Sequence, residues 1–143
     1  GCSKYRRAFG VPEKKAQDNF TDPDSRIMKT SSGGFEQCYN AQAAVDAEHQ
    51  IIVAASVTQS AADANQLIPV VDQACGNVKA VPKTVLADAG YRSEQNLQGL
   101  EERQIEPVVS LGREGKQMPE IDANLKATLR LKRRLESERG KNL

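Results

Sequence analysis

Short apolar segments alternate with polar stretches along most of the chain, and their periods predict both strands and helices. A period near two over residues 35–45 and a β-branched run at 51–58 predict two antiparallel strands with a loop between them at 46–50. Short apolar runs at 84–87 and 107–111 predict two further strands. The chain therefore contains at least four segments with strand character.

Three segments carry apolar residues at helical spacing: 60–76, 93–102 and 123–135. Ser60 is predicted to cap the first helix, with Asp63 three positions on completing an approximate capping box. Pro69 removes a hydrogen bond inside that helix and predicts a kink. Gly76 is predicted to end it, and Ser93 is predicted to cap the second helix.

The succession of elements is β-β-α-β-α-β-α, which predicts an α/β domain with a mixed sheet. Residues 1–34 form an irregular basic N-terminal segment, broken by prolines and a Ser-Ser-Gly-Gly run, with a brief extended piece at 26–28. Residues 35–112 form the α/β core, and residues 113–143 form a loop followed by a basic helix. This division is the predicted domain organisation.

Composition limits the class of protein. The chain has 143 residues, the size of one ordinary domain, and 38% of them are hydrophobic. No apolar run approaches the roughly 20 residues of a membrane span, and no apolar stretch follows the charged start as in a signal peptide. Three isolated cysteines and a single histidine, His49, argue against a zinc site and against disulfides, which fits a reducing cytoplasm.

The charge is unevenly distributed. Residues 1–20 and 125–143 carry net charges of +3 and +5, whereas residues 21–124 carry −7. An acidic centre with basic ends suits a protein that holds metal ions in the middle and a polyanion at its edges. Solvated chain ends are often charged as well, so this distribution alone does not establish nucleic-acid binding.

One carboxylate stands out as a candidate for chemistry. Asp88 follows the predicted strand at 84–87 directly, and a glycine, a tyrosine and Arg92 come soon after it. Open α/β sheets usually place their chemistry at such strand ends. The alternative is that Asp88 is a helix N-cap or a turn residue. For Asp63 the residues favour a place at a helix N-terminus, and for Asp46 a solvated hairpin loop.

Three blocks of the chain resemble bacterial insertion-sequence transposases of the DDE type. They are NFTDPDSRIM at 19–28, GFEQCYNAQAAVD at 34–46 and LADAGY at 86–91, and the resemblance runs from about Lys15 to the C-terminus. It implies an RNase H-like core and metal-dependent cleavage and joining of DNA at transposon ends and target. It also implies a homodimer when full-length, in the bacterial cytoplasm, without membrane association.

The family's chemistry uses two Asp and one Glu around two Mg²⁺ (or Mn²⁺) ions, which activate the attacking hydroxyl and stabilise the leaving oxygen. Asp88 matches the second catalytic Asp, so the resemblance assigns it both a catalytic and a metal-binding role. Arg92 is a candidate contact to DNA phosphate. In the basic helix, Lys132, Arg133 and Arg134 are further candidates, with a solvated helix face as the alternative.

The match does not extend to the other two acids. No predicted strand before residue 35 ends in Asp, and Asp22 and Asp24 flank a proline in a predicted loop. Glu136 and Glu138 come too early for the catalytic Glu and sit among cations, where surface ion pairs are expected. The RNase H-like domain is therefore predicted to be incomplete, with its first strand and last catalytic helix missing.

Three functions follow from these observations. The leading prediction is the central fragment of a transposase, inactive alone because it holds one of three catalytic acids. The alternative is a non-catalytic DNA-binding or dimerisation remnant of a transposase gene. A third is a small metal-dependent nuclease that uses Asp88 with Asp46 or Asp63. It requires those carboxylates within about 8 Å of each other, since paired metal ions lie about 4 Å apart.

Overall fold

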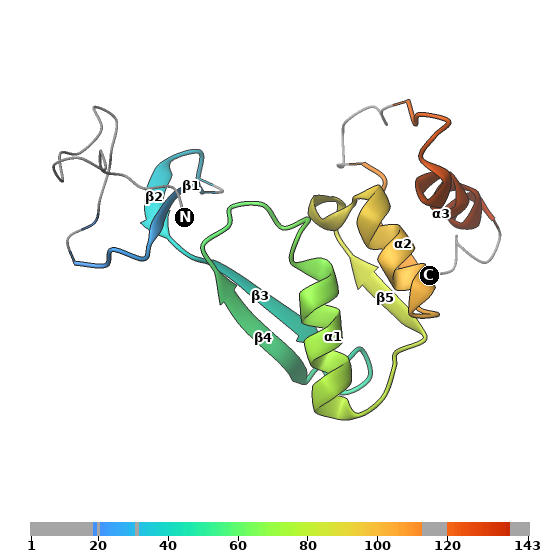
Figure 1. Ribbon diagram of the computed structural model, residues 1–143, viewed down its shortest axis with the longest axis horizontal. Coiled ribbons are helices and arrows are strands. Elements are labelled where there is room, and N and C mark those ends of the chain that lie inside the picture. Colours follow the sequence, from blue (N-terminus) through green and yellow to red (C-terminus); the bar gives the residue numbers. More distant parts are fainter. Residues whose placement is uncertain (1–18, 20, 31, 113–119, 138–143) are drawn as a thin grey trace, which may run out of the picture. The chain divides into compact units, whose positions relative to one another are not determined.

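The computed structural model describes residues 19, 21–30, 32–112 and 120–137 (Figure 1). The chain divides into two compact units. The first consists of residues 1–40 and 59–61, and the second of residues 41–58 and 62–143. Most of the predicted irregular segment at 1–34 lies outside the described residues, so the predicted domain division stays a prediction.

In the first unit, β1 (Arg26–Lys29) pairs with β2 (Phe35–Cys38) in antiparallel register. The extended piece predicted at 26–28 is therefore a strand. The intervening turn is closed by the amide of Thr30, which donates to the carbonyl of Gly34 at 2.9 Å. Gly33 has a φ of 88°, a left-handed conformation that favours glycine.

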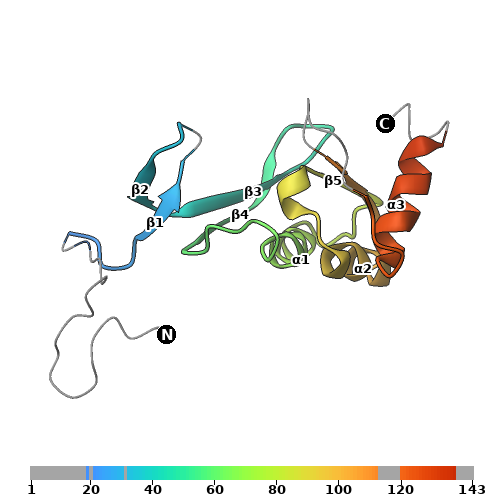
Figure 2. The same ribbon diagram turned by 90° about the horizontal axis from the view of Figure 1, so that it is seen from above.

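In the second unit, which contains all of β3 except Asn40, β3 (Asn40–Val45) and β4 (Ile52–Thr58) pair as a hairpin (Figures 1 and 2). The predicted strand at 35–45 is therefore two strands, β2 and β3. In the turn, the amide of Asp46 donates to the carbonyl of Ile51 at 2.8 Å, and Gln50 has a φ of 56°. The predicted hairpin is confirmed.

Helix α1 (Leu67–Val78) packs along β4. The side-chain amides of Gln73 and Asn77 donate to carbonyl oxygens of β4, at Ala55 (3.2 Å) and Val53 (2.8 Å). Gln73 and Asn77 are four residues apart and lie on one face of the helix, so these two bonds align the helix with the strand.

Three predictions about this helix are wrong. It starts at Leu67 rather than near Ser60, with Gln66 at its N-cap, and the carboxylate of Asp63 accepts a hydrogen bond from Gln42 of β3. Pro69 is consequently in the first turn, where its missing N–H is not needed, so it costs no helical hydrogen bond. The helix passes Gly76 and ends at Val78, followed by Lys79 in the left-handed conformation (φ 55°).

The segment from β5 to β6 is a parallel β-α-β unit. Strand β5 (Thr84–Ala87) leads through the short 3₁₀ helix η1 (Ala89–Tyr91) into α2 (Glu94–Glu102) and then into β6 (Glu106–Val109). The two strands pair in parallel, from Thr84 opposite Glu106 to Ala87 opposite Val109. Ser93 caps α2 as predicted, accepting a hydrogen bond from the amide of Asn96 at 3.1 Å.

Helix α2 supplies the centre of two apolar clusters. Leu100 packs with Leu67, Val71 and Ile105, which joins α2 to α1. On the other side Leu97 packs with residues of β6, its following loop and α3 (Lys126–Glu136): Val109, Leu111, Ala127 and Leu131. Leu97 and Leu100 are fully buried. The core of the second unit is therefore built around α2.

The mixed α/β class is confirmed, and from β3 onward the elements follow one another as predicted. The described strands form three separate pairs, β1-β2, β3-β4 and β5-β6, and not one continuous sheet. The strand order of a single RNase H-like sheet accordingly stays a prediction.

Candidate active site

Asp88 lies directly after β5, at the carboxyl end of a parallel strand pair. Its side chain is exposed, and its Oδ1 accepts a hydrogen bond of 2.7 Å from the amide of Gly90, which makes Asp88 the N-cap of η1. A Cβ at Gly90 would lie only 2.9 Å from that oxygen. Glycine at this position therefore allows the turn to close against the carboxylate.

A second carboxylate approaches the same point. It belongs to Asp63, which lies on the loop before α1. Its Oδ2 would lie 3.2 Å from a Cβ placed on Gly90. The oxygens of Asp63 and Asp88 therefore cannot be further apart than the sum of their two distances to that point. The two oxygens therefore lie within the limit of about 8 Å that the paired-metal alternative sets for these residues.

Buried polar groups hold this arrangement. Gln42 of β3, which is 4% exposed, donates from Nε2 to Asp63 Oδ1 at 3.0 Å. Its Oε1 in turn accepts the hydroxyl of Tyr91. Asn96, 5% exposed, donates from Nδ2 to the carbonyls of Ala64 (2.5 Å) and Tyr91 (2.7 Å). The loop of Asp63 and the turn after Asp88 are thus fixed to each other and to β3.

The pKa of Tyr91 is affected by its burial and by the charges of Asp63 and Asp88. Burial raises the pKa of its hydroxyl, and the negative charges of Asp63 and Asp88 raise it further. Tyr91 also packs against the apolar cluster around Leu100. Its role in this structure is therefore packing and hydrogen bonding beneath the two carboxylates.

The donor set suits a hard divalent cation. Mg²⁺ and Mn²⁺ prefer carboxylate and water oxygens, and two carboxylates converge on space that glycine leaves open. Within the described ranges, no group of three or more His, Cys, Asp and Glu side chains is arranged to hold a metal ion. The metal role of Asp88 therefore stays a prediction from the resemblance.

The other acids considered from the sequence have local partners. In the first unit, Asp22 Oδ1 accepts the hydroxyl of Tyr39 at 2.8 Å. Asp46 Oδ2 accepts the backbone amide of His49 at 2.7 Å, which lowers the pKa of the carboxyl. Glu136 lies 3.9 Å from Lys132, the surface ion pair that was predicted. Glu138 lies outside the described residues.

The candidate phosphate-binding cations differ in how they are used. Arg92 donates to the carbonyl of Leu111. Arg134 donates to the carbonyl of Pro107 at 3.3 Å and lies 3.4 Å from Glu106. Arg133 of α3 is exposed. Of these three arginines, Arg133 is therefore the one whose guanidinium is most open to a ligand.

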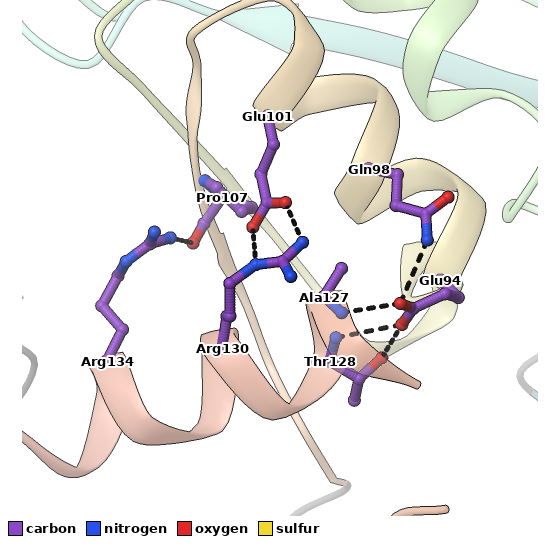
Figure 3. A network of polar contacts seen from close by, with 8 residues as sticks. All are labelled: Glu94, Gln98, Glu101, Pro107, Ala127, Thr128, Arg130 and Arg134. Atoms are coloured by element: carbon purple, nitrogen blue, oxygen red, sulfur yellow. Dashed lines mark hydrogen bonds and ion pairs between the residues drawn. The ribbon is translucent and has the colours of Figure 1, made fainter. Parts of the chain in front are cut away.

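Helix α3 is fixed to the rest of the unit by polar contacts as well as by its buried face (Figure 3). Arg130 forms a bidentate pair with Glu101 of α2. The N-terminus of α3 has no cap of its own; Glu94 accepts the amides of Ala127 (2.6 Å) and Thr128 (3.0 Å), and Figure 3 shows this contact. A carboxylate at this position also interacts favourably with the helix dipole.

We expect Glu94→Gln to lower the free energy of unfolding by about 1–2 kcal/mol at pH 7, the range of a lost helix cap. Burial alone would raise the pKa of Glu94, but hydrogen bonds from Ala127, Thr128 and Gln98 outweigh it and hold the pKa below its ordinary 4.5. A lowered pKa means that this stabilisation is complete above pH 4.5 and is lost as the pH falls through the folded-state pKa.

Thermal unfolding of both proteins between pH 7 and pH 3 measures this difference. The gap between wild type and Glu94→Gln should close at the acid end. Glu102→Gln is the control, because Glu102 is an exposed acid in the last turn of the same helix. Equal unfolding curves for the two variants would show that Glu94 does not cap α3.

The sequence gives no signal for the contacts of three residues around Asp88. Gln42 was not singled out, because an isolated glutamine in an alternating strand carries no local signal. Asp63 was assigned to a helix N-terminus, yet its carboxylate contacts Gln42, 21 residues away. Asn96 likewise looks like an ordinary helix residue. The pairing of a carboxylate with a buried amide became visible only from the folded chain.

The family model of the transposase DDE domain matches residues 10–142. Comparison with curated proteins and with solved structures finds no match. In the described part of the chain, no helix is long and apolar enough to cross a membrane.

Proposed function

Since the chain belongs to the transposase DDE domain family, we propose that it is the central part of a DNA transposase that cleaves and joins DNA by metal-dependent phosphoryl transfer. Asp88 is the second catalytic acid in this proposal. The observation that carries it is the place of Asp88, exposed at the carboxyl end of β5 with Gly90 and Tyr91 directly after it. Strand ends of this kind are where α/β proteins usually hold their ligands.

A divalent cation, Mg²⁺ or Mn²⁺, completes the proposed site. When bound, such an ion increases the nucleophilicity of an attacking hydroxyl and stabilises a leaving oxygen. Asp88 would hold the ion through its exposed carboxylate. Gly90 orients that carboxylate through its amide, and Tyr91 and Asn96 keep the turn in place. A homodimer on DNA in the bacterial cytoplasm stays a prediction from the resemblance.

Only one position of this chain matches a catalytic acid of the family, so we expect the chain alone not to cut DNA. Incubation with supercoiled plasmid and Mg²⁺ or Mn²⁺ should leave the plasmid intact. Nicking by the wild type that disappears in Asp88→Ala would contradict the expectation that one catalytic acid is insufficient for cleavage.

A longer protein, in which this chain lies between a strand ending in Asp and a helix carrying Glu, should cleave DNA. Failure of that protein to do so would contradict the proposed function.

The second candidate is a DNA-binding remnant without chemistry, and the basic helix α3 favours it. We expect Arg133→Ala to weaken duplex DNA binding and to reduce the slope of log affinity against log salt by about 1, as for one lost phosphate contact. Fluorescence anisotropy with a labelled duplex at several salt concentrations measures both quantities.

Arg134→Ala is the matched control. The guanidinium of Arg134 is engaged by Pro107 and Glu106, so its loss should affect stability more than the salt slope. If Arg133→Ala leaves the slope unchanged, α3 does not contact phosphate through this residue.

A further inference from the structure

We propose that Lys126, Arg130 and Arg133 form one face of α3 that binds the phosphate backbone of duplex DNA, and that Glu101 competes with the phosphates for Arg130. The inference rests on the proposed function, which supplies DNA as the partner, and it extends a single contact of Arg133 to a surface. All three cations are exposed. They occupy positions i, i+4 and i+7 of the helix, which lie on the same face.

The stability of α3 does not account for these cations. Lys126 is the first residue of the helix, where the dipole disfavours a positive charge, and the first turn has no acid of its own. Lys126 and Arg130 are like charges four positions apart, a spacing that destabilises a helix. A helix face that is only solvated typically alternates acids and bases. A negatively charged partner therefore explains the three cations better than the helix itself does.

The cationic face is held in a fixed orientation. Ala127, Thr128 and Leu131 are buried on the opposite side of α3, and Glu94 accepts the amides at its N-terminus. At a rise of about 1.5 Å per residue, the three cations extend over about 10 Å. One strand of duplex DNA presents about three phosphates over that length. The face therefore suits successive phosphates, a contact that positions DNA without reading its bases.

Glu101 of α2 occupies the middle cation of this face. Its carboxylate forms a bidentate pair with the guanidinium of Arg130, and Figure 3 shows this pair between α2 and α3. The side chain of Arg130 is 50% exposed, so a phosphate has access to it. Carboxylate and phosphate use the same fork of N–H donors on arginine. A phosphate that binds Arg130 therefore has to displace Glu101 or share the guanidinium with it.

The test is binding of the full chain to a fluorescently labelled DNA duplex of random sequence, measured by anisotropy at several salt concentrations. We expect Lys126→Ala to weaken binding and to reduce the slope of log affinity against log salt by about 1, as for one lost phosphate contact. Alanine favours the start of a helix more than lysine does, so loss of the helix cannot produce this result.

Glu101→Gln is expected to act in the opposite direction. It releases Arg130, so binding should tighten several-fold at low salt and the slope should increase by about 1. A purely structural role of Glu101 predicts weaker or unchanged binding instead. Arg130→Ala in the Glu101→Gln background should remove the gain, because the released guanidinium is then absent.

Glu102→Gln is the control for charge alone, because Glu102 is an exposed acid one residue further along the same helix. It should tighten binding less than Glu101→Gln does and leave the slope unchanged. Equal effects of the two variants on affinity and slope would overturn the competition at Arg130.

Three other results would overturn the surface itself. They are a wild-type chain that does not bind the duplex, an unchanged salt slope in Lys126→Ala, and weaker binding of Lys126→Ala to polyglutamate but not to DNA. The last result would assign the face to an acidic protein segment. None of them affects the proposed role of Asp88, which is tested separately by cleavage in the longer protein.

Discussion

Replacing Asp88 with asparagine is expected to reduce DNA cleavage by about a thousandfold or more in a transposase that contains this chain and the other two acids. Loss of a charged metal ligand removes several kcal/mol of transition-state stabilisation, and each 1.36 kcal/mol is a factor of ten in rate. Asparagine keeps an oxygen that can accept the amide of Gly90, so the turn is expected to persist. Single-turnover cleavage of an end-labelled transposon end measures the rate.

Asp72→Asn is the control for this experiment. Asp72 is an acid of α1 whose carboxylate pairs with Arg103, with its oxygens 2.7 and 2.8 Å from the guanidinium. Its partner is Arg103 of the end of α2 and not a residue of the turn after β5, so its replacement should leave cleavage within about twofold, as for an ordinary surface change. A rate for Asp88→Asn within about tenfold of the wild type would remove Asp88 from the catalytic acids.

Local sequence predicted those parts of the fold whose contacts are also local. Strand β5 and helix α2 were both placed correctly, because the apolar run, the Ser93 cap and the helical spacing of Leu97 and Leu100 act within a few residues. The position of Asp88 at the end of β5 followed for the same reason. It depends on one strand and the turn after it, both of which lie within a few residues of sequence.

The predictions that were wrong or missing concern elements fixed by contacts between segments far apart in the sequence. The start of α1 was misplaced because Ser60 and Asp63 resemble a capping box, whereas in the folded chain the carboxylate of Asp63 contacts Gln42 of β3. The cap of α3 is Glu94, more than 30 residues before the helix, so no signal near Lys126 could have identified it. In both cases an acid appropriate for a nearby helix end was used by a segment far away in sequence.

The same distinction separates the two carboxylates of the candidate site. Asp88 could be found from sequence because its strand, its glycine and its tyrosine are consecutive. Asp63 was named from sequence only as one of two possible partners of Asp88, because its proximity depends on Oδ2 approaching Gly90, 27 positions further along the chain. A local motif therefore marks Asp88 in the sequence, whereas only the folded chain shows that Asp63, and not Asp46, approaches the turn after it.

Replacing Leu100 with alanine is expected to lower the free energy of unfolding by about 2–5 kcal/mol. Leu100 is 0% exposed and contacts Leu67, Val71 and Ile105, so the shorter side chain leaves a cavity between α1 and α2. The loss is a large part of the 5–15 kcal/mol that stabilises a typical domain. For a chain of this size, a loss of about 3 kcal/mol lowers the melting temperature by roughly 10 °C. Circular dichroism during heating measures the change.

Leu86→Ala is the matched control, because Leu86 is the same residue type in a neighbouring element and is 80% exposed. Its replacement should change the free energy of unfolding by about 0.5 kcal/mol or less. Equal destabilisation by the two variants would mean that Leu86 is covered in solution, by another strand or another molecule, and that the face of β5 carrying it is an interface. A negligible effect of Leu100→Ala would instead contradict the packing of α1 on α2. The segments that hold Asp63 and Asp88 lead into α1 and α2 respectively. The same result would therefore also contradict the placement of Asp63 beside Asp88.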